Sequence, residues 1–197
     1  MGELFSFDVE AVNEETISAL SIGNSHGGLI ALCDGRTYPD LTLESIKENG
    51  FYVMIEGIED PYNFGYALRS IYASGVDGII LSERNWLSAA GVVCRSSAGA
   101  SERADIYIAN DSFIETFKEK GYKIVCADIK NSVSIYDADL KKPIFLIVGG
   151  EKRGISSSVI SKADQIVRID YGRSFDAALS AASASTIIAF EVFKQNR

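Results

Sequence analysis

The stretch that decides the fold is PIFLIVGGEKRGI, residues Pro143–Ile155. Its first half is the most continuous apolar run in the chain, which predicts a central strand buried on both faces of a sheet. Three glycines follow this run, Gly149, Gly150 and Gly154. Because glycine adopts backbone conformations closed to other residues, the loop after the strand can turn tightly against a bound molecule.

A second stretch, EGIEDPYNFGYALR at Glu56–Arg69, follows another apolar run at residues 51–55. It predicts a helix that opens just past Pro61. An apolar run at residues 78–81 then completes one strand-helix-strand unit. The helix is supported by apolar residues at the spacing i, i+3, i+4, i+7 and i+8, which are Phe64, Ala67, Leu68, Ile71 and Tyr72.

The same alternation continues along the chain. It predicts a fold of class α/β, with a mostly parallel sheet covered by helices on both faces. The further predicted elements are a strand at 106–108, a helix at 112–120 stopped by Gly121, a strand at 123–127, a brief helix near 156–162, a strand at 165–169 and a helix from about Ala177 to Lys194.

Length and composition are those of one globular domain, with 197 residues, 47% of them hydrophobic and 23% charged. No apolar run reaches the roughly 18 to 20 residues of a membrane helix, and the N-terminus does not resemble a signal peptide. We therefore expect a cytoplasmic protein without a membrane segment. The three cysteines lie far apart without Cys-x-x-Cys pairing, and His26 is the single histidine, so we expect buried cysteines and no metal site.

The formal net charge of −8 is not what is expected of a protein that neutralises many phosphates. Net charge describes the whole surface, however, and a local patch can be basic on an acidic protein. Six basic residues lie near the glycine-rich stretches in sequence and could form such a patch: Arg69, Arg84, Arg95, Lys152, Arg153 and Arg173.

The two stretches resemble the first and second motifs of the SpoU/TrmH branch of the SPOUT superfamily of RNA ribose methyltransferases. The first motif of that family reads approximately Asp-Pro-x-Asn-x-Gly with an arginine four residues on, and the second reads Gly-x-Glu-x-x-Gly; both are present here. Between them, Arg95–Glu102 resembles the family's Ser-Ala-Gly-Ala segment, and His26–Ala31 resembles the stretch before its catalytic domain. The resemblance runs from about residue 26 to residue 191, and four motifs in the correct order are a specific signal.

This resemblance implies that a methyl group is transferred from S-adenosylmethionine to a ribose 2′-hydroxyl of tRNA or rRNA. It also implies a deep trefoil knot near the C-terminus, and a homodimer whose interface includes the helix at 177–194 and part of the helix after Asn63. The many small side chains of the last helix favour close helix approach, although an ordinary alanine-rich helix on its own sheet would look the same. We expect residues 1–48 to be a short N-terminal extension without a complete substrate-binding domain, and residues 49–197 to be the catalytic domain.

The third motif departs from the family pattern, in which an apolar-Pro step and a glycine precede Ser-Leu-Asn-x-Ser. Here Asp170 replaces the proline and Ala178-Leu179-Ser180 replaces Ser-Leu-Asn. One interpretation is a non-catalytic RNA- or S-adenosylmethionine-binding protein that has lost turnover. The other, favoured by the intact first two motifs, is a divergent subfamily whose polar groups come from Ser174, Asp176 or Ser180.

The resemblance assigns catalytic roles to Asn63, Arg69 and Glu151, and we add Ser180 from the altered third motif. A guanidinium with a pKa above about 12 is a poor base, so Arg69 is expected to bind phosphate and position the ribose. Asn63 would hydrogen-bond either Arg69 or the ribose, and Glu151 would pair with Arg69 and fix its rotamer. For the methyl donor the expected residues are Gly149, Gly150, Ile169 and Leu179, and for RNA they are Arg95, Lys152 and Arg153.

Each catalytic candidate also has an ordinary structural explanation. Asn63 suits the N-cap of the helix, Arg69 would face solvent by helical periodicity, and Glu151 is a carboxylate on a loop. Their joint appearance in motif order favours the catalytic interpretation. The competing function class is a nucleotide-binding α/β enzyme, but residues 149–154 lack both the Gly-Lys-Ser/Thr ending of a phosphate loop and the Gly-x-Gly-x-x-Gly fingerprint.

Overall fold

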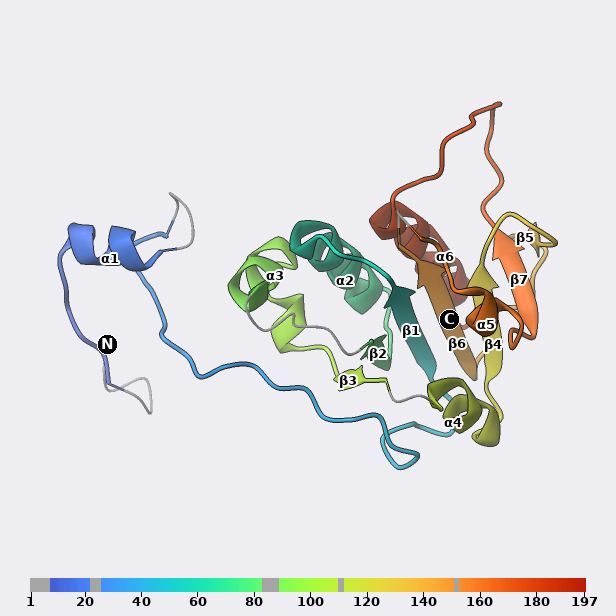
Figure 1. The fold of residues 1–197 in the computed structure, drawn as a ribbon, viewed down its shortest axis with the longest axis horizontal. Coiled ribbons are helices and arrows are strands. Elements are labelled where there is room, and N and C mark those ends of the chain that lie inside the picture. Colours follow the sequence, from blue (N-terminus) through green and yellow to red (C-terminus); the bar gives the residue numbers. More distant parts are fainter. Residues whose placement is uncertain (1–7, 22–25, 83–88, 110–111, 151–152) are drawn as a thin grey trace. The chain divides into compact units, whose positions relative to one another are not determined.

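The computed structural model describes residues 8–21, 26–82, 89–109, 112–150 and 153–197 (Figure 1). The chain divides into two compact units, residues 1–35 and 36–197. The smaller unit contains helix α1 (Glu14–Leu20), in which the N–H of Thr16 donates to Oδ1 of the cap residue Asn13 at 2.8 Å. The larger unit holds the sheet and takes in residues 36–48, which the sequence analysis grouped with the N-terminal extension.

The sheet of the larger unit has seven strands in the order β3-β2-β1-β6-β4-β7-β5, and every described pairing is parallel. The predicted central strand is therefore confirmed, because β6 occupies the fourth of the seven positions. The strands are β1 (Phe51–Glu56), β2 (Gly78–Leu81), β3 (Ile106–Ile108), β4 (Lys123–Ala127), β5 (Val133–Ser134), β6 (Ile144–Gly149) and β7 (Gln165–Arg168).

Helices cover both faces of this sheet, as predicted. They are α2 (Pro61–Ala73), α3 (Ala90–Ser96), α4 (Phe113–Glu119), α5 (Ser157–Ile160) and α6 (Ala181–Gln195), with a short 3-10 helix η3 (Ala100–Glu102). Helices α2, α3 and α6 contribute to one hydrophobic cluster, and α4 and α5 contribute to the other. Within the described part of the chain, no helix has the length and apolar character needed to cross a membrane. The C-terminal knot stays a prediction.

Strand β1 shows how the sequence builds two cores at once. Phe51, Val53 and Ile55 pack in the cluster that contains α2 and α6. Tyr52 and Met54, which point to the opposite face, pack in the cluster that contains α4. Successive side chains of a strand alternate between faces, so a strand buried on both sides must be apolar throughout.

The structure corrects one predicted boundary and adds elements that were not predicted. The last helix begins at Ala181 rather than near Ala177, because Ser180 caps it and its Oγ accepts a hydrogen bond from the N–H of Ser183 at 3.1 Å. Helix α3, η3 and the two-residue strand β5 were not predicted, since such short elements give little periodic signal.

A half-buried carboxylate holds the amino-terminal edge of the sheet. Asp77 precedes β2, and its Oδ2 accepts a hydrogen bond from the N–H of Phe51 at 2.9 Å. It also pairs with Lys47 at 2.8 Å and with Lys142 at 3.2 Å. Burial alone would raise the pKa of Asp77, but the hydrogen bonds from Lys47, Phe51 and Lys142 outweigh that cost and lower it. This one side chain thereby joins the starts of β1, β2 and β6.

We expect Asp77→Asn to lower the free energy of unfolding at neutral pH by about 1.5 to 3 kcal/mol, the range for hydrogen bonds to a charged group. Because the folded state lowers the pKa of Asp77, its stabilisation is present above the unfolded value of about 4 and is lost as the pH falls through the folded value. Urea titrations should therefore show the difference between wild type and variant shrinking below about pH 4.

The matched control is Asp139→Asn, since Asp139 also pairs with a lysine at 2.8 Å but its side chain is 63% exposed. An exposed pair contributes about 0 to 1 kcal/mol. Equal losses from the two substitutions would contradict the role given to Asp77.

Candidate active site

The two glycine-containing stretches, far apart in sequence, meet at the carboxyl edge of the sheet. Strands β1 and β6 pair in register up to Glu56 and Gly149. Just beyond them, the N–H of Gly150 donates to the carbonyl oxygen of Glu56 at 2.6 Å, and the N–H of Ser156 donates to Oε2 of Glu56 at 3.2 Å. Glu56 therefore accepts hydrogen bonds from residues at both ends of the loop after β6. In open α/β sheets this edge is where ligands bind.

The glycines of this loop are required by backbone contact. A Cβ atom on Gly149 would lie 2.5 Å from the carbonyl carbon of Gly154, and one on Gly150 would lie 2.5 Å from the carbonyl oxygen of Gly57. Gly57 and Gly154 themselves have positive φ angles of 77° and 64°. The backbone of Gly149 thus contacts that of Gly154, and the backbone of Gly150 contacts that of Gly57, with no room for a side chain at Gly149 or Gly150.

Helix α2 starts at a cap that the sequence analysis did not identify. Oδ1 and Oδ2 of Asp60 accept hydrogen bonds from the N–H groups of Tyr62 and Asn63, each at 3.2 Å. Asn63 is therefore not the cap; it lies half-buried in the first turn. Arg69 lies eight residues beyond Pro61, about 12 Å along the axis at the usual helical rise, and its side chain is exposed.

The segment that resembles Ser-Ala-Gly-Ala packs directly on helix α2. A Cβ atom on Gly65 would lie 1.8 Å from Oγ of Ser96, at the end of α3. The chain then reverses through two left-handed residues, Ala98 and Gly99, with φ angles of 52° and 80°. The segment therefore ends α3 and places Ser96 against Gly65 of α2.

The predicted RNA-binding residues that the structure describes are both exposed. Arg95 lies in the last turn of α3, and Arg153 lies in the loop after β6. Glu151 and Lys152 lie outside the described residues.

The altered third motif forms the loop of residues 169–180 between β7 and α6. Ile169 is half-buried against the core and Leu179 is half-buried at the other end of the loop. Asp170, which stands where the family has proline, pairs with Nε of Arg168 at 2.8 Å. Ser180 caps α6, so its hydroxyl has a structural use besides the catalytic role predicted for it.

The Cys126 thiol, in β4, is a poor nucleophile. Burial, with smaller effects from the charges of Glu56 and Asp128, raises the pKa of the Cys126 thiol to about 12, so it stays protonated at neutral pH. The expectation of buried cysteines is wrong for Cys33, which is exposed, and Cys94 is only partly buried. Across the described ranges, no group of three or more His, Cys, Asp or Glu side chains could hold a metal ion.

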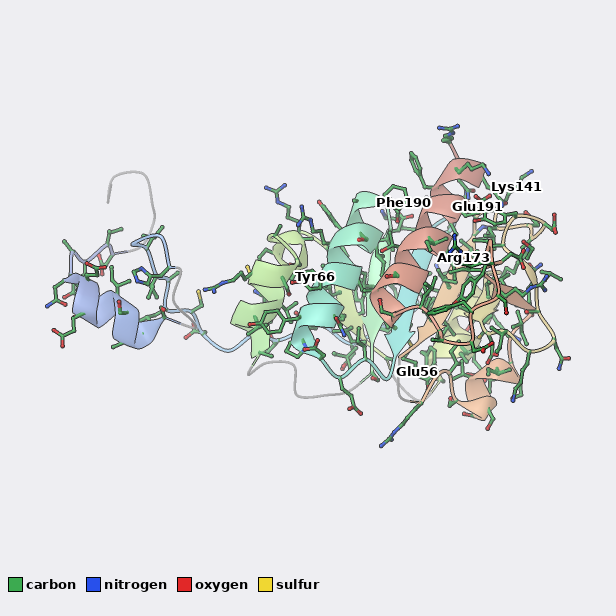
Figure 2. All side chains as sticks on the ribbon, turned by 90° about the horizontal axis from the view of Figure 1, so that it is seen from above. Glu56, Tyr66, Lys141, Arg173, Phe190 and Glu191 are labelled. Atoms are coloured by element: carbon green, nitrogen blue, oxygen red, sulfur yellow. The ribbon has the colours of Figure 1, made fainter. Side chains whose placement is uncertain are left out.

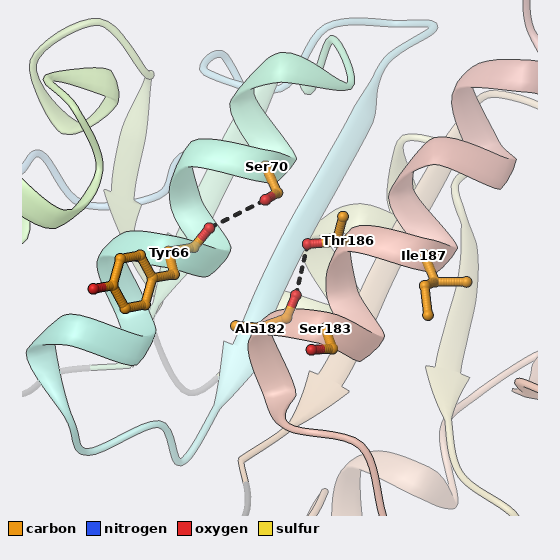
Figure 3. A pocket seen from close by; sticks show the side chains of 6 residues that line it. All are labelled: Tyr66, Ser70, Ala182, Ser183, Thr186 and Ile187. Atoms are coloured by element: carbon orange, nitrogen blue, oxygen red, sulfur yellow. Dashed lines mark hydrogen bonds between the residues drawn. The ribbon is translucent and has the colours of Figure 1, made fainter.

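An open pocket of about 350 Å³ lies between α2 and α6 (Figure 3). Tyr66 and Ser70 line it from α2, and four residues line it from α6: Ala182, Ser183, Thr186 and Ile187. Its polar groups are partly used within each helix, where Ser70 donates to the carbonyl of Tyr66 and Thr186 donates to the carbonyl of Ala182.

Several large apolar side chains of α6 and α2 are exposed, which the sequence analysis missed. On α6, the exposed fractions of Ile187, Phe190 and Phe193 are 36%, 43% and 46%. Tyr66 on the neighbouring helix α2 is 52% exposed (Figure 2). The spacing of three from 187 to 190 to 193 was the available signal, because apolar residues so spaced share one side of a helix.

The negative charge is concentrated in the smaller unit. Residues 1–35 contain six acidic residues and no lysine or arginine. All 19 basic residues and 21 of the 27 acidic residues therefore belong to residues 36–197, whose formal charge is −2. The acidic balance of the whole chain does not describe the unit that holds the candidate site.

Comparisons with known proteins agree with this architecture. A protein of Staphylococcus saprophyticus, assigned to the TrmH family of tRNA/rRNA methyltransferases, is 29% identical over 194 residues, covering 95% of this chain and 77% of that protein. The crystal structure of an AdoMet-bound rRNA methyltransferase from Sinorhizobium meliloti aligns with a TM-score of 0.72 and 28% identity, over 81% of this chain and 61% of that one.

An RNA 2′-O ribose methyltransferase structure aligns with a TM-score of 0.71 at 23% identity, over 93% of this chain and 70% of that one, and supports the fold. This chain thus spans about three fifths of the Sinorhizobium structure and more of the other two relatives. The sequence profile of the SpoU rRNA Methylase family matches residues 50–190, which include both glycine-containing stretches and the whole sheet. The chain therefore belongs to the SpoU rRNA methylase family, the SpoU/TrmH-type RNA methyltransferases.

Proposed function

We propose that this protein transfers a methyl group from S-adenosylmethionine to a ribose 2′-hydroxyl of tRNA or rRNA. The observation that carries the proposal is the meeting of the first and second motifs at one edge of the sheet, where Glu56 and Gly149 pair in register. The family supports methyl transfer to RNA in general. The choice of the ribose rests on the retained motif residues, Asn63 and Arg69 above all.

The loops at this edge fit the methyl donor. The described parts of the loop after β6, residues 149–150 and 153–155, are held together by close backbone contacts. Peptide groups of these residues would bind the donor. Ile169 and Leu179 add half-buried apolar side chains, which suit an adenine ring. When bound, S-adenosylmethionine supplies an electrophilic methyl group on a sulfonium. Gly149, Gly150, Ile169 and Leu179 would hold it.

Arg69 would act on the RNA. The 2′-oxygen must be aimed at the methyl carbon, so that the carbon–oxygen bond forms as the carbon–sulfur bond breaks, and the hydroxyl proton must leave. An exposed guanidinium can bind a phosphate bidentately and so fix the ribose beside it. Arg69 lies about 12 Å along α2 from the start of the helix. This position favours a contact with RNA over a contact with the donor-binding loop of the same chain.

A homodimer would explain this separation. Helices α2 and α6 pack against each other, and both carry exposed apolar side chains. Exposed apolar patches typically mark protein interfaces. The small residues of α6 are less informative than the sequence suggested, because Ala181, Ser185 and Ala189 face the chain's own core. Arg69 is exposed on α2, so a second copy packed on this surface would bring Arg69 near another chain.

The third motif supports a second candidate, a binding protein without turnover. Ser180 already caps α6, and Ala178 is exposed on the loop. If these positions supply no polar group to the reaction, the protein would bind S-adenosylmethionine and RNA without methylating. Calorimetric titration with S-adenosylmethionine, beside a tritium-transfer assay on total RNA, separates the two candidates.

Gly149→Ala should weaken S-adenosylmethionine binding by more than about tenfold, or about 1.4 kcal/mol. The added Cβ would meet the backbone of Gly154 at 2.5 Å and force the loop open. Gly35→Ala is the control, since a Cβ there meets nothing within 4 Å. Calorimetry measures the affinity and circular dichroism verifies the fold. Unchanged affinity in a folded Gly149 variant would remove this loop from the donor site.

Arg69→Ala should abolish methyl transfer while S-adenosylmethionine affinity stays within about threefold, a change of about 0.7 kcal/mol. Arg69→Lys should recover little, because an ammonium cannot reproduce the bidentate fork. Arg197→Ala removes the same charge from another exposed position and should leave activity intact. Normal methylation by the Arg69→Ala variant would show that the residue is only a solvated helix side chain.

Ile187→Glu should convert a dimer to a monomer of 21.4 kDa, because it would bury a charge in the apolar surface of α6. The matched control is Ile129→Glu, which places the same charge at an isoleucine 79% exposed elsewhere. Light scattering at micromolar concentration reports the mass. A wild-type monomer that methylates RNA would reject the dimer.

A further inference from the structure

The loop between β7 and α6 carries an aromatic surface that the proposed reaction does not use. Figure 1 shows this loop as the orange-red segment that leaves β7, extends beyond the sheet and returns to α6. Tyr171 is 40% exposed and Phe175 is 59% exposed. Their ring centroids lie 6.2 Å apart with planes tilted by 49°, so the two rings form one surface.

This surface is built into the loop. The N–H of Leu179 donates to the Tyr171 hydroxyl oxygen at 3.1 Å, and that hydroxyl donates to the carbonyl oxygen of Ala177 at 3.5 Å. These two hydrogen bonds connect the first part of the loop, at Tyr171, with its last part, at residues 177–179, and hold the tyrosine ring in place. The Phe175 ring has no polar group, so its exposure to water gains no hydrogen bond and leaves an apolar face uncovered.

A cation stands between the two rings in sequence. Arg173 is exposed, and the structure records no ion pair for it with any residue that it describes. The nearby carboxylate of Asp170 is already paired with Arg168. An aromatic pair beside an available guanidinium is the combination that binds single-stranded nucleic acid, because rings stack on bases and the cation binds phosphate.

We infer that Tyr171, Arg173 and Phe175 form a stacking platform for an unpaired base of the RNA substrate, which makes that substrate a single-stranded loop or bulge. The inference rests on the proposed function. The ends of the same loop, Ile169 and Leu179, are the residues proposed for the methyl donor, so a base held on the platform lies beside the reacting group. A base inside a duplex has no free face for such stacking.

The adenine of the methyl donor is also able to stack on aromatic rings, so the test must separate the two ligands. One probe is a fluorescein-labelled single-stranded RNA oligonucleotide, read by anisotropy, with the same strand in a duplex for comparison. The other is S-adenosylmethionine, read by calorimetry. The full chain is used throughout.

Phe175→Ala should weaken single-strand binding by about tenfold, with duplex binding and S-adenosylmethionine affinity within about threefold of wild type. Phe175→Leu should lose as much, because leucine is apolar but has no ring face, whereas Phe175→Tyr should bind like wild type. The matched control is Tyr136→Ala, since Tyr136 is also 59% exposed but lies outside the loop. Arg173→Ala should lower the slope of log affinity against log salt by about 0.7 for the single strand.

The platform is rejected if wild type binds the single strand and the Phe175→Ala variant binds it equally well, while the proposed function stands. It is also rejected if that variant loses S-adenosylmethionine affinity and keeps RNA affinity, because the rings would then belong to the donor site. Failure of the wild type to bind either RNA would overturn the proposed function, and this inference with it.

Discussion

The close approach of two backbones at the carboxyl ends of β1 and β6 is the constraint on which the site depends. Gly150 contacts Gly57 where a Cβ atom would lie 2.5 Å from the backbone, and Gly149 contacts Gly154 in the same way. Because main chain meets main chain, these two contacts do not depend on side-chain rotamers. Glu56 then holds the loop at both ends through its carbonyl and carboxylate oxygens. Backbone contacts that are in place before a ligand arrives lower the ordering cost of binding it.

Much of the fold could be predicted because burial on both faces leaves a plain pattern in sequence. The run at residues 144–148 predicted the central strand, and the spacing of apolar residues from Phe64 to Tyr72 predicted helix α2. The parallel pairing of β1 and β6 in the structure brings the ends of these strands to one edge of the sheet. These predictions succeeded because each depends on one element and its period, and not on the partners that the element finds.

The details of the site could not be predicted because they depend on competition between neighbouring residues. Asp60 and Asn63 are both good capping residues, and only the three-dimensional structure shows that Asp60 takes the cap. Ser180 looked like a substitute for a lost catalytic group, yet it ends a loop and starts α6. The net charge of the whole chain concealed its uneven distribution, since residues 1–35 hold six acids and no base.

The contact between Gly65 and Ser96 has a consequence for how this chain can change in evolution. A methyl group at position 65 would occupy the place of the serine oxygen, so neither position can gain volume while the other stays as it is. Positions 65 and 96 are 31 residues apart in sequence but must vary as a pair. A larger residue at either position would require a compensating substitution at the other, so each single substitution would destabilise the packing of α2 against α3. Helix packing can therefore preserve the serine-containing segment even if it never touches the RNA.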